Sequence, residues 1–303
     1  MGDYRASVFT ARAGSVLAMS SHKQFVEVLG RQMAYVEAGA GDPIVLLHGN
    51  PTSSYLWRSV IPALEGSGRC VAPDLIGMGD SGKLEPGPGV YRFETHRRYI
   101  DGLLESLGVD SHVTLVGHDW GGALLFDWAH RHPGAVKAIA YMETIVSPVE
   151  WSDWPEAASS IFQAMRSPAG ESIVLEKNVF VERILPASAL APLSEDSLTE
   201  YRRPFLEPQH RWPTLTWPRE IPIGGEPADV HGIVSAYSEW MGENQIPKLF
   251  VNAEPGSILT GRQRELCRSW PNQIEVTVPG SHFVQEDSGV AIGSHVADWL
   301  ASL

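Results

Sequence analysis

The sequence has few basic residues, few cysteines and no long hydrophobic run. Lys and Arg number 23 against 36 Asp and Glu, so the formal net charge is -13 and the basic surface typical of nucleic-acid-binding proteins is missing. Cys70 and Cys267 are too few for a disulfide framework, which favours a reducing cytoplasm. The apolar runs are much shorter than the roughly 18 residues that cross a bilayer. We expect a soluble cytoplasmic protein without nucleic-acid or membrane partners.

Residues 1–22 contain no continuous apolar core of the kind that a signal peptide requires. Gly, Ala and Ser dominate this segment, and no period is visible in it. We therefore predict a loose N-terminal extension. The whole sequence is 43% hydrophobic and 19% charged, a composition typical of a globular protein with a large core.

From Phe25 onward, short apolar runs alternate with longer amphipathic stretches. Two strands at 25–29 and 31–37 are joined at Gly30, as in a hairpin. Further strands are expected at 44–47, 70–73, 113–116, 136–142, 248–252 and 274–278. Helical stretches are expected among them, at 55–64, 93–107, 123–129, 262–268 and 290–300. This alternation predicts an α/β fold, with a mostly parallel eight-stranded sheet flanked by helices, in a core domain of residues 23–146 and 228–303.

The segment 147–227 interrupts this alternation. It has no strand periodicity, Pro recurs in it, and it is rich in Trp, Phe and Tyr. Open α/β sheets bind ligands at the carboxyl ends of their strands. A helical cap inserted after the strand 136–142 would cover that edge and enclose a pocket, and the aromatic residues would form either its lining or the core of the cap itself.

A strand, a turn and a helix meet at Gly117-His-Asp119-Trp-Gly121. This spacing is typical of a nucleophile elbow, in which glycines let the strand turn sharply and expose the central side chain beside helix amides. A carboxylate at that point can displace a leaving group from saturated carbon and form an ester. Asp119 is therefore the candidate nucleophile, the alternative being a simple helix N-cap.

An ester at Asp119 has to be hydrolysed, which requires a base that takes a proton from the attacking water. His282 follows the last predicted strand, where this fold places its histidine, and His118 is the nearest rival. The acid that orients the histidine is either Glu143 or Glu254, since each follows a strand and precedes His282. The spacing does not choose between them.

The loop His48-Gly-Asn50-Pro follows the strand 44–47. In this fold such a loop supplies one oxyanion-hole amide, and the residue after the nucleophile supplies the other. The side chains of Asn50 and Trp120 also carry neutral N–H donors. Two such donors beside a carboxylate nucleophile would suit a departing halide.

With these residues in place, the sequence resembles the haloalkane dehalogenases of the α/β-hydrolase superfamily from about Phe25 to the C-terminus. The resemblance rests on residues 48–58, 74–79, 117–121, 142–143, 151–155 and 282–287. It is strongest for the subgroup that holds halide with Asn and Trp, which implies halide binding by Asn50 and Trp120. In that subgroup the triad acid follows the strand before the cap, which implies Glu143. The pocket residues implied by the resemblance are Phe180, Trp217 and Pro218.

The implied reaction uses neither a cofactor nor a metal. Asp119 would attack the carbon that bears the halogen, and His282 with Glu143 would then activate water to hydrolyse the ester. The substrate would be a small halogenated aliphatic compound that, with water, yields an alcohol, halide and a proton. Chlorinated, brominated and iodinated substrates, their chain length and the oligomeric state all remain open.

Three other functions compete with this interpretation. An epoxide hydrolase also uses an elbow Asp and a His, and would need cap tyrosines such as Tyr201 and Tyr237 as acids, but Asn50 stands where that family normally has an aromatic residue. A coelenterazine luciferase resembles dehalogenases in its Asp, Trp, Glu and His. A receptor on a hydrolase scaffold would have no need of the three catalytic groups together.

Overall fold

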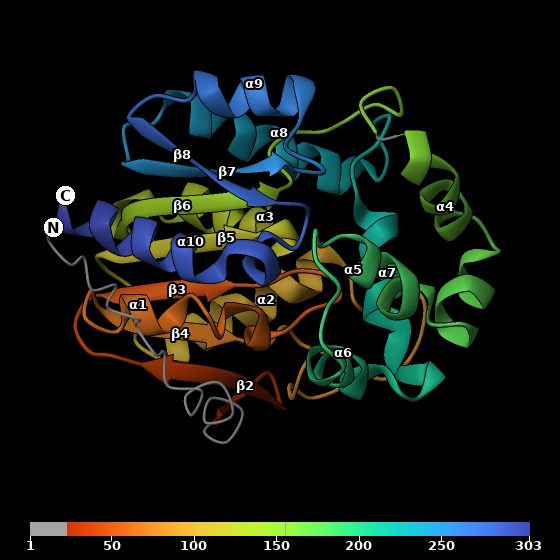
Figure 1. The fold of residues 1–303 in the computed structure, drawn as a ribbon. Helices are drawn as coiled ribbons and strands as arrows, with labels where there is room; N and C mark the ends of the chain where they lie inside the picture. The colour runs from red at the N-terminus through yellow and green to blue at the C-terminus, as the bar shows by residue number, and fades with distance from the viewer. Residues whose placement is uncertain (1–22, 155) are drawn as a thin grey trace, which may run out of the picture.

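The computed structural model describes residues 23–154 and 156–303, and the predicted N-terminal extension at 1–22 lies outside them. An eight-stranded sheet with the order β1-β2-β4-β3-β5-β6-β7-β8 crosses the molecule (Figure 1). Its strands are β1 (Gln24–Val28), β2 (Arg31–Ala38), β3 (Pro43–Leu47), β4 (Arg69–Pro73), β5 (Val113–His118), β6 (Val136–Thr144), β7 (Lys248–Pro255) and β8 (Gln273–Gly280). β2 is antiparallel to β1 and β4, and all other pairs are parallel. The predicted α/β fold and its mostly parallel sheet are confirmed.

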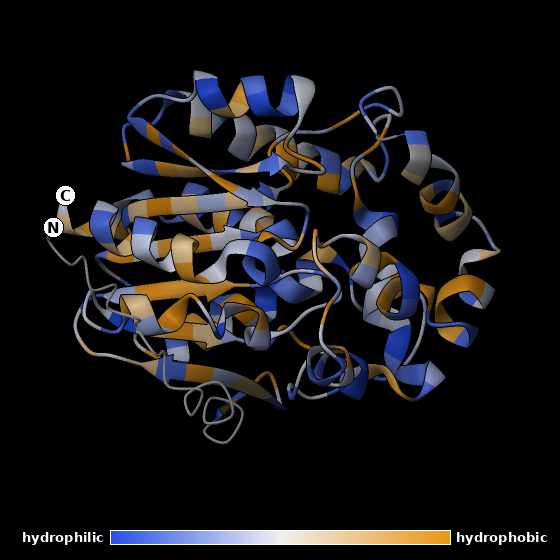
Figure 2. Cartoon of the chain, in the orientation of Figure 1, coloured by the Kyte–Doolittle hydropathy of each residue, from blue (hydrophilic) through white to orange (hydrophobic). Residues whose placement is uncertain are grey.

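Both faces of the central strands are buried, because helices cover each face. Alternate residues of β3 enter two different hydrophobic clusters, with Ile44 and Leu46 in one and Val45 and Leu47 in the other. Such strands read as continuous apolar runs, and β3 is coloured as hydrophobic along most of its length in Figure 2. One face packs on α1 (Ile61–Leu64) and α10 (Val284–Ala301), and the other on α2 (Phe93–Ser106), α3 (Asp119–Arg131) and α8 (Ala228–Glu243).

The short helices follow the predicted pattern less closely. The stretch 55–64 is divided between η2 (Ser54–Trp57) and α1, and η3 (Pro133–Ala135) leads into β6. α9 (Gly261–Ser269) lies between β7 and β8. The predicted elements do not include residues 228–243, where the structure has α8. Among the described residues, no helix combines the length and apolar character needed to span a bilayer.

We refer to residues 147–227, the predicted cap, as the cap segment. The chain enters it from the carboxyl end of β6, and its helices lie beyond that edge of the sheet (Figure 1). They are α4 (Glu156–Arg166), η4 (Glu171–Glu176), η5 (Phe180–Ile184), α5 (Leu185–Ala187), α6 (Glu195–Arg202), η6 (Arg203–Phe205), η7 (Pro208–Arg211) and α7 (Trp212–Glu220).

Glu286, in the first turn of α10, ties the cap segment to the core. Its two carboxylate oxygens each accept a hydrogen bond of 2.6 Å from the guanidinium of Arg58, and Tyr201 of α6 donates to one of them. The side chains of Glu286 and Arg58 are only 5% and 13% exposed. Burial of a charge is costly unless a partner compensates it, so this carboxylate stabilises both the guanidinium and the docking of α6.

Replacing Glu286 should therefore destabilise the fold. In Glu286→Gln the buried guanidinium of Arg58 loses its counter-charge, and we expect the free energy of unfolding to fall by roughly 3 kcal/mol in urea denaturation. Asp42→Asn is the matched control, because its exposed ion pair with Lys137 should contribute almost nothing. Equal losses in the two variants would contradict this account.

Candidate active site

Asp119 occupies the turn between β5 and α3. Its backbone is in the left-handed region at a φ of 51°, a conformation that costs a residue with a side chain about 1–2 kcal/mol. The turn is tight because α3 starts against the end of β3: a Cβ on Gly121 would lie 2.1 Å from the carbonyl oxygen of Leu47. The glycine thus permits the close approach that fixes the direction of the Asp119 side chain.

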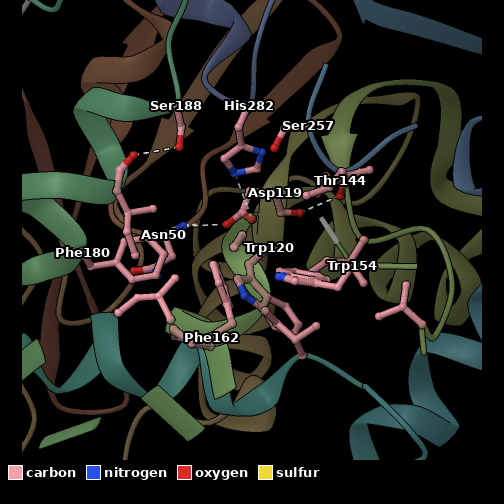
Figure 3. Close-up of a pocket in the computed structure, with 18 of the residues that line it drawn as sticks. Asn50, Asp119, Trp120, Thr144, Trp154, Phe162, Phe180, Ser188, Ser257 and His282 are labelled. Carbon is pink, nitrogen blue, oxygen red and sulfur yellow. Dashed lines mark hydrogen bonds and ion pairs between the residues drawn. The ribbon is translucent and has the colours of Figure 1, made fainter. Parts of the chain in front are cut away.

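The carboxylate of Asp119 is held from two sides. Oδ1 accepts a 2.7 Å hydrogen bond from the amide of Asn50, and Oδ2 lies 3.4 Å from Nε2 of His282. The hydroxyl of Thr144 donates to the Asp119 carbonyl at 2.6 Å, a contact that the sequence analysis missed (Figure 3). Burial alone would raise the pKa of Asp119, but His282 and the amide of Trp120 outweigh it and hold the pKa below its usual value.

His282 lies between two carboxylates. Its Nδ1 is 3.4 Å from Oε2 of Glu143, on the side opposite Asp119. Burial would lower the pKa of His282, but the hydrogen bonds with Asp119 and Glu143 outweigh it and raise the pKa to about 9. The imidazole is therefore protonated at neutral pH while Asp119 is charged.

Glu143 is itself fixed by the backbone. Its fully buried carboxylate accepts hydrogen bonds from the amides of Ser257, Ile258 and Leu259 at 3.1, 2.9 and 3.3 Å. These amides belong to the loop between β7 and α9. Buried charges need such donors, and the loop thereby holds the carboxylate toward the histidine.

The two rivals from the sequence lie outside this arrangement. Glu254 is exposed and pairs with Arg264 at 3.2 Å. His118 donates from Nε2 to the carbonyl oxygen of His282 at 2.7 Å, and burial lowers its pKa to about 3. His118 is therefore a neutral support for the His282 loop, and the structure brings together Asp119, His282 and Glu143.

A cavity of about 540 Å³ opens beside Asp119. Asn50, Trp120 and His282 line it together with mostly apolar side chains of the cap segment (Figure 3). Within residues 23–154 and 156–303, neither the amide nitrogen of the Asn50 side chain nor the indole nitrogen of Trp120 donates to a protein group. Both donors are free to bind an anion next to the carboxylate.

The described part of the chain holds no cluster of His, Cys, Asp and Glu suited to a metal ion.

The predicted pocket residues differ in position. Phe180 and Pro218 line the cavity, whereas Trp217 does not. In the structure the fully buried ring of Trp217 stacks on Trp120, with centroids 4.6 Å apart, and on His96 at 4.3 Å. Trp217 therefore supports the Trp120 ring from behind.

The two tyrosines considered as epoxide acids are also remote from the cavity lining. Tyr201 donates to Glu286, and Tyr237 donates to the carbonyl oxygen of Ile145. Neither side chain lines the cavity. The site therefore lacks, among its described lining residues, a tyrosine that could protonate an epoxide oxygen.

Known proteins are similar to this chain over more than nine-tenths of its length. A family model described as the alpha/beta hydrolase fold matches residues 42–191. The chain is 56% identical to a haloalkane dehalogenase of Sphingobium indicum over 93% of this chain and 96% of that protein, and 49% identical to one of Mycolicibacterium smegmatis over 92% and 91%. The crystal structure of a haloalkane dehalogenase from Bradyrhizobium elkani has a TM-score of 0.88 at 41% identity, covering 93% of this chain and 98% of that one.

The charge of the candidate base should depend on Asp119. We expect the imidazole of His282 to titrate near pH 9 in the free protein, and its pKa to fall toward 6.5 in Asp119→Asn because one of its two carboxylates is neutralised. Since the folded pKa is the higher one, the stabilisation from this charge is complete below pH 6.5 and is lost as the pH rises through 9. NMR titration of the ring protons measures the shift, and an unchanged pKa in the variant would contradict the pairing.

Proposed function

The chain belongs to the haloalkane dehalogenases of the α/β-hydrolase fold, and from this premise we propose that it hydrolyses carbon–halogen bonds through a covalent ester of Asp119. The observation that carries this proposal is the placement of a buried carboxylate beside two unpartnered N–H donors and a histidine. Residues 147–227 serve as the cap that encloses the substrate. The buried, unpaired cysteines support a cytoplasmic location.

In the first step Asp119 displaces the halide. Oδ1 is retained by the Asn50 amide, so Oδ2 is the oxygen that attacks the carbon bearing the halogen. The carbon–halogen bond breaks as the carbon–oxygen bond forms, and negative charge moves onto the halogen. The side-chain N–H groups of Asn50 and Trp120 stabilise that charge where it develops, which accelerates the reaction because the neutral substrate gains less from them.

In the second step His282 acts as the base. Formation of the ester removes the charge of Asp119, which is one of the two carboxylates that raise the pKa of the imidazole. The pKa of His282 therefore falls in the intermediate, and the neutral imidazole can take a proton from water. Water attacks the ester carbonyl, whose oxygen receives charge beside the amides of Asn50 and Trp120, and the alcohol leaves.

Glu143 is the positioning acid in this scheme. Its contact with Nδ1 keeps Nε2 directed at Asp119, and its negative charge stabilises the imidazolium that forms in the second step. Overall, one haloalkane and one water give one alcohol, one halide and one proton.

Halide release tests the proposal directly. Purified protein should release bromide from 1,2-dibromoethane and iodide from 1-iodobutane, and Asp119→Ala should reduce the rate at least about 10³-fold because the nucleophile is gone. Circular dichroism of the variant controls for folding. Absence of halide release by the folded wild-type protein would refute the proposed function.

In His282→Phe, formation of the ester should still occur while its hydrolysis should stop. Because the base enters only after the ester forms, this variant should release about one equivalent of halide and then stop. Intact-protein mass spectrometry should show the added mass of the alkyl group, and peptide mass analysis after proteolysis should locate it on the peptide that contains Asp119. Continued turnover at a rate near that of the wild type would contradict the role of His282.

A further inference from the structure

We propose that the cavity contains a second polar subsite, formed by Ser147, Gln263 and Trp154, which binds a hydrogen-bond acceptor on the substrate such as an ether oxygen. This inference rests on the proposed function, because it concerns the substrate of the same cavity. The three residues line the same cavity as the candidate halide donors Asn50 and Trp120 and would recognise a part of the substrate other than the halogen.

Gln263 supplies the main evidence. It lines the cavity from α9 and is only 6% exposed. The hydroxyl of Ser147 donates to its Oε1 at 2.7 Å, which fixes the carboxamide, while its Nε2 has no partner in the described parts of the chain. A buried amide N–H is normally paired, since leaving it unpaired costs free energy. An acceptor that enters the cavity can remove this cost.

Trp154 supplies a second donor in the lining of the same cavity. Its Nε1 is buried and finds no acceptor within the described ranges, and its ring packs edge-on against Phe162 at 4.8 Å between centroids. The ion pair of Asp153 with Arg262, with 3.2 Å between Oδ1 and Nε, brings the chain neighbours Trp154 and Gln263 together. Figure 3 shows Trp154 on the side of the cavity opposite Phe180.

The chain sets an upper limit on the distance between Ser147 and the backbone of Asp119. Thr144 contacts the backbone of Asp119, and Ser147 comes three residues later. Three residues span at most about 10 Å. An acceptor several bonds from the halogen-bearing carbon could therefore reach the subsite.

The chemistry of the subsite selects a neutral acceptor. Its donors are an amide and an indole, and the neighbouring guanidinium of Arg262 is already paired with Asp153. The rest of the wall is largely apolar. A hydrocarbon tail would leave both N–H groups unpaired, whereas an ether oxygen in the tail would accept from them while its carbon atoms contact the apolar wall.

Three substrates of equal chain length test this proposal: 1-bromohexane, 1-bromo-3-ethoxypropane and 1-bromo-4-methoxybutane. Their reacting carbons are alike, so differences in kcat/KM arise from how the protein contacts the tail of the substrate. The quantity compared is the ether-to-alkane ratio, which is kcat/KM for the better ether divided by kcat/KM for 1-bromohexane. We expect this ratio to fall about 3- to 10-fold in Gln263→Met, because the substitution removes the amide but keeps a side chain of similar length. Trp154→Phe, which removes the indole donor and keeps an aromatic ring, should lower the same ratio.

Ile161→Met is the matched control, because it changes a lining residue that has no donor. Its ether-to-alkane ratio should equal that of the wild type. An equal ratio in the wild type, Gln263→Met and Trp154→Phe would overturn the subsite while leaving the proposed function intact. Absence of halide release from all three substrates by the wild type would instead refute the proposed function, and the subsite with it.

Discussion

The close contact between the end of β3 and the start of α3 is the constraint on which the site depends. The Cβ of any residue larger than glycine at position 121 would collide with the backbone of Leu47, and one at position 49 would meet the carboxylate of Asp119 at 2.1 Å. This packing forces Asp119 into a left-handed conformation and brings its carboxylate to the amide of Asn50. The backbone strain is thus stored where the side chain has to be directed into the cavity.

Electrostatics then determines how the three titratable groups behave together. Glu143 is stabilised by three backbone amides, and Asp119 by the amide of Asn50, so both carboxylates can be buried close to one imidazole. Their combined effect outweighs the burial that would otherwise keep His282 neutral. Under the proposed mechanism, the same charge balance changes when Asp119 is esterified, and this change converts the imidazolium into a base.

The cap segment and the His282 loop are joined by hydrogen bonds. The amide of Phe283 donates to the carbonyl oxygen of Ser188 at 3.0 Å. Asp287 accepts from the amides of Leu190 and Ser281 at 2.8 and 3.0 Å. These contacts fix the loop that carries the histidine against the segment that encloses the cavity. The position of the base and the shape of the pocket therefore depend on the same packing.

The sequence by itself determined the fold class, because apolar runs and amphipathic stretches alternate with the periods of buried strands and covering helices. It also predicted Asp119, His282, Asn50 and Trp120 as site residues, since the glycine spacing of the elbow and the order along the chain are local signals, and the structure places all four in the lining of one cavity. Only the tertiary structure showed that Glu143 lies beside His282 while Glu254 pairs with Arg264, that Trp217 stacks on Trp120, and that Ser147, Trp154 and Gln263 line the same cavity. Those relations are made by residues far apart in the chain, and distances between such residues are not encoded in any local pattern but follow from how the helices pack.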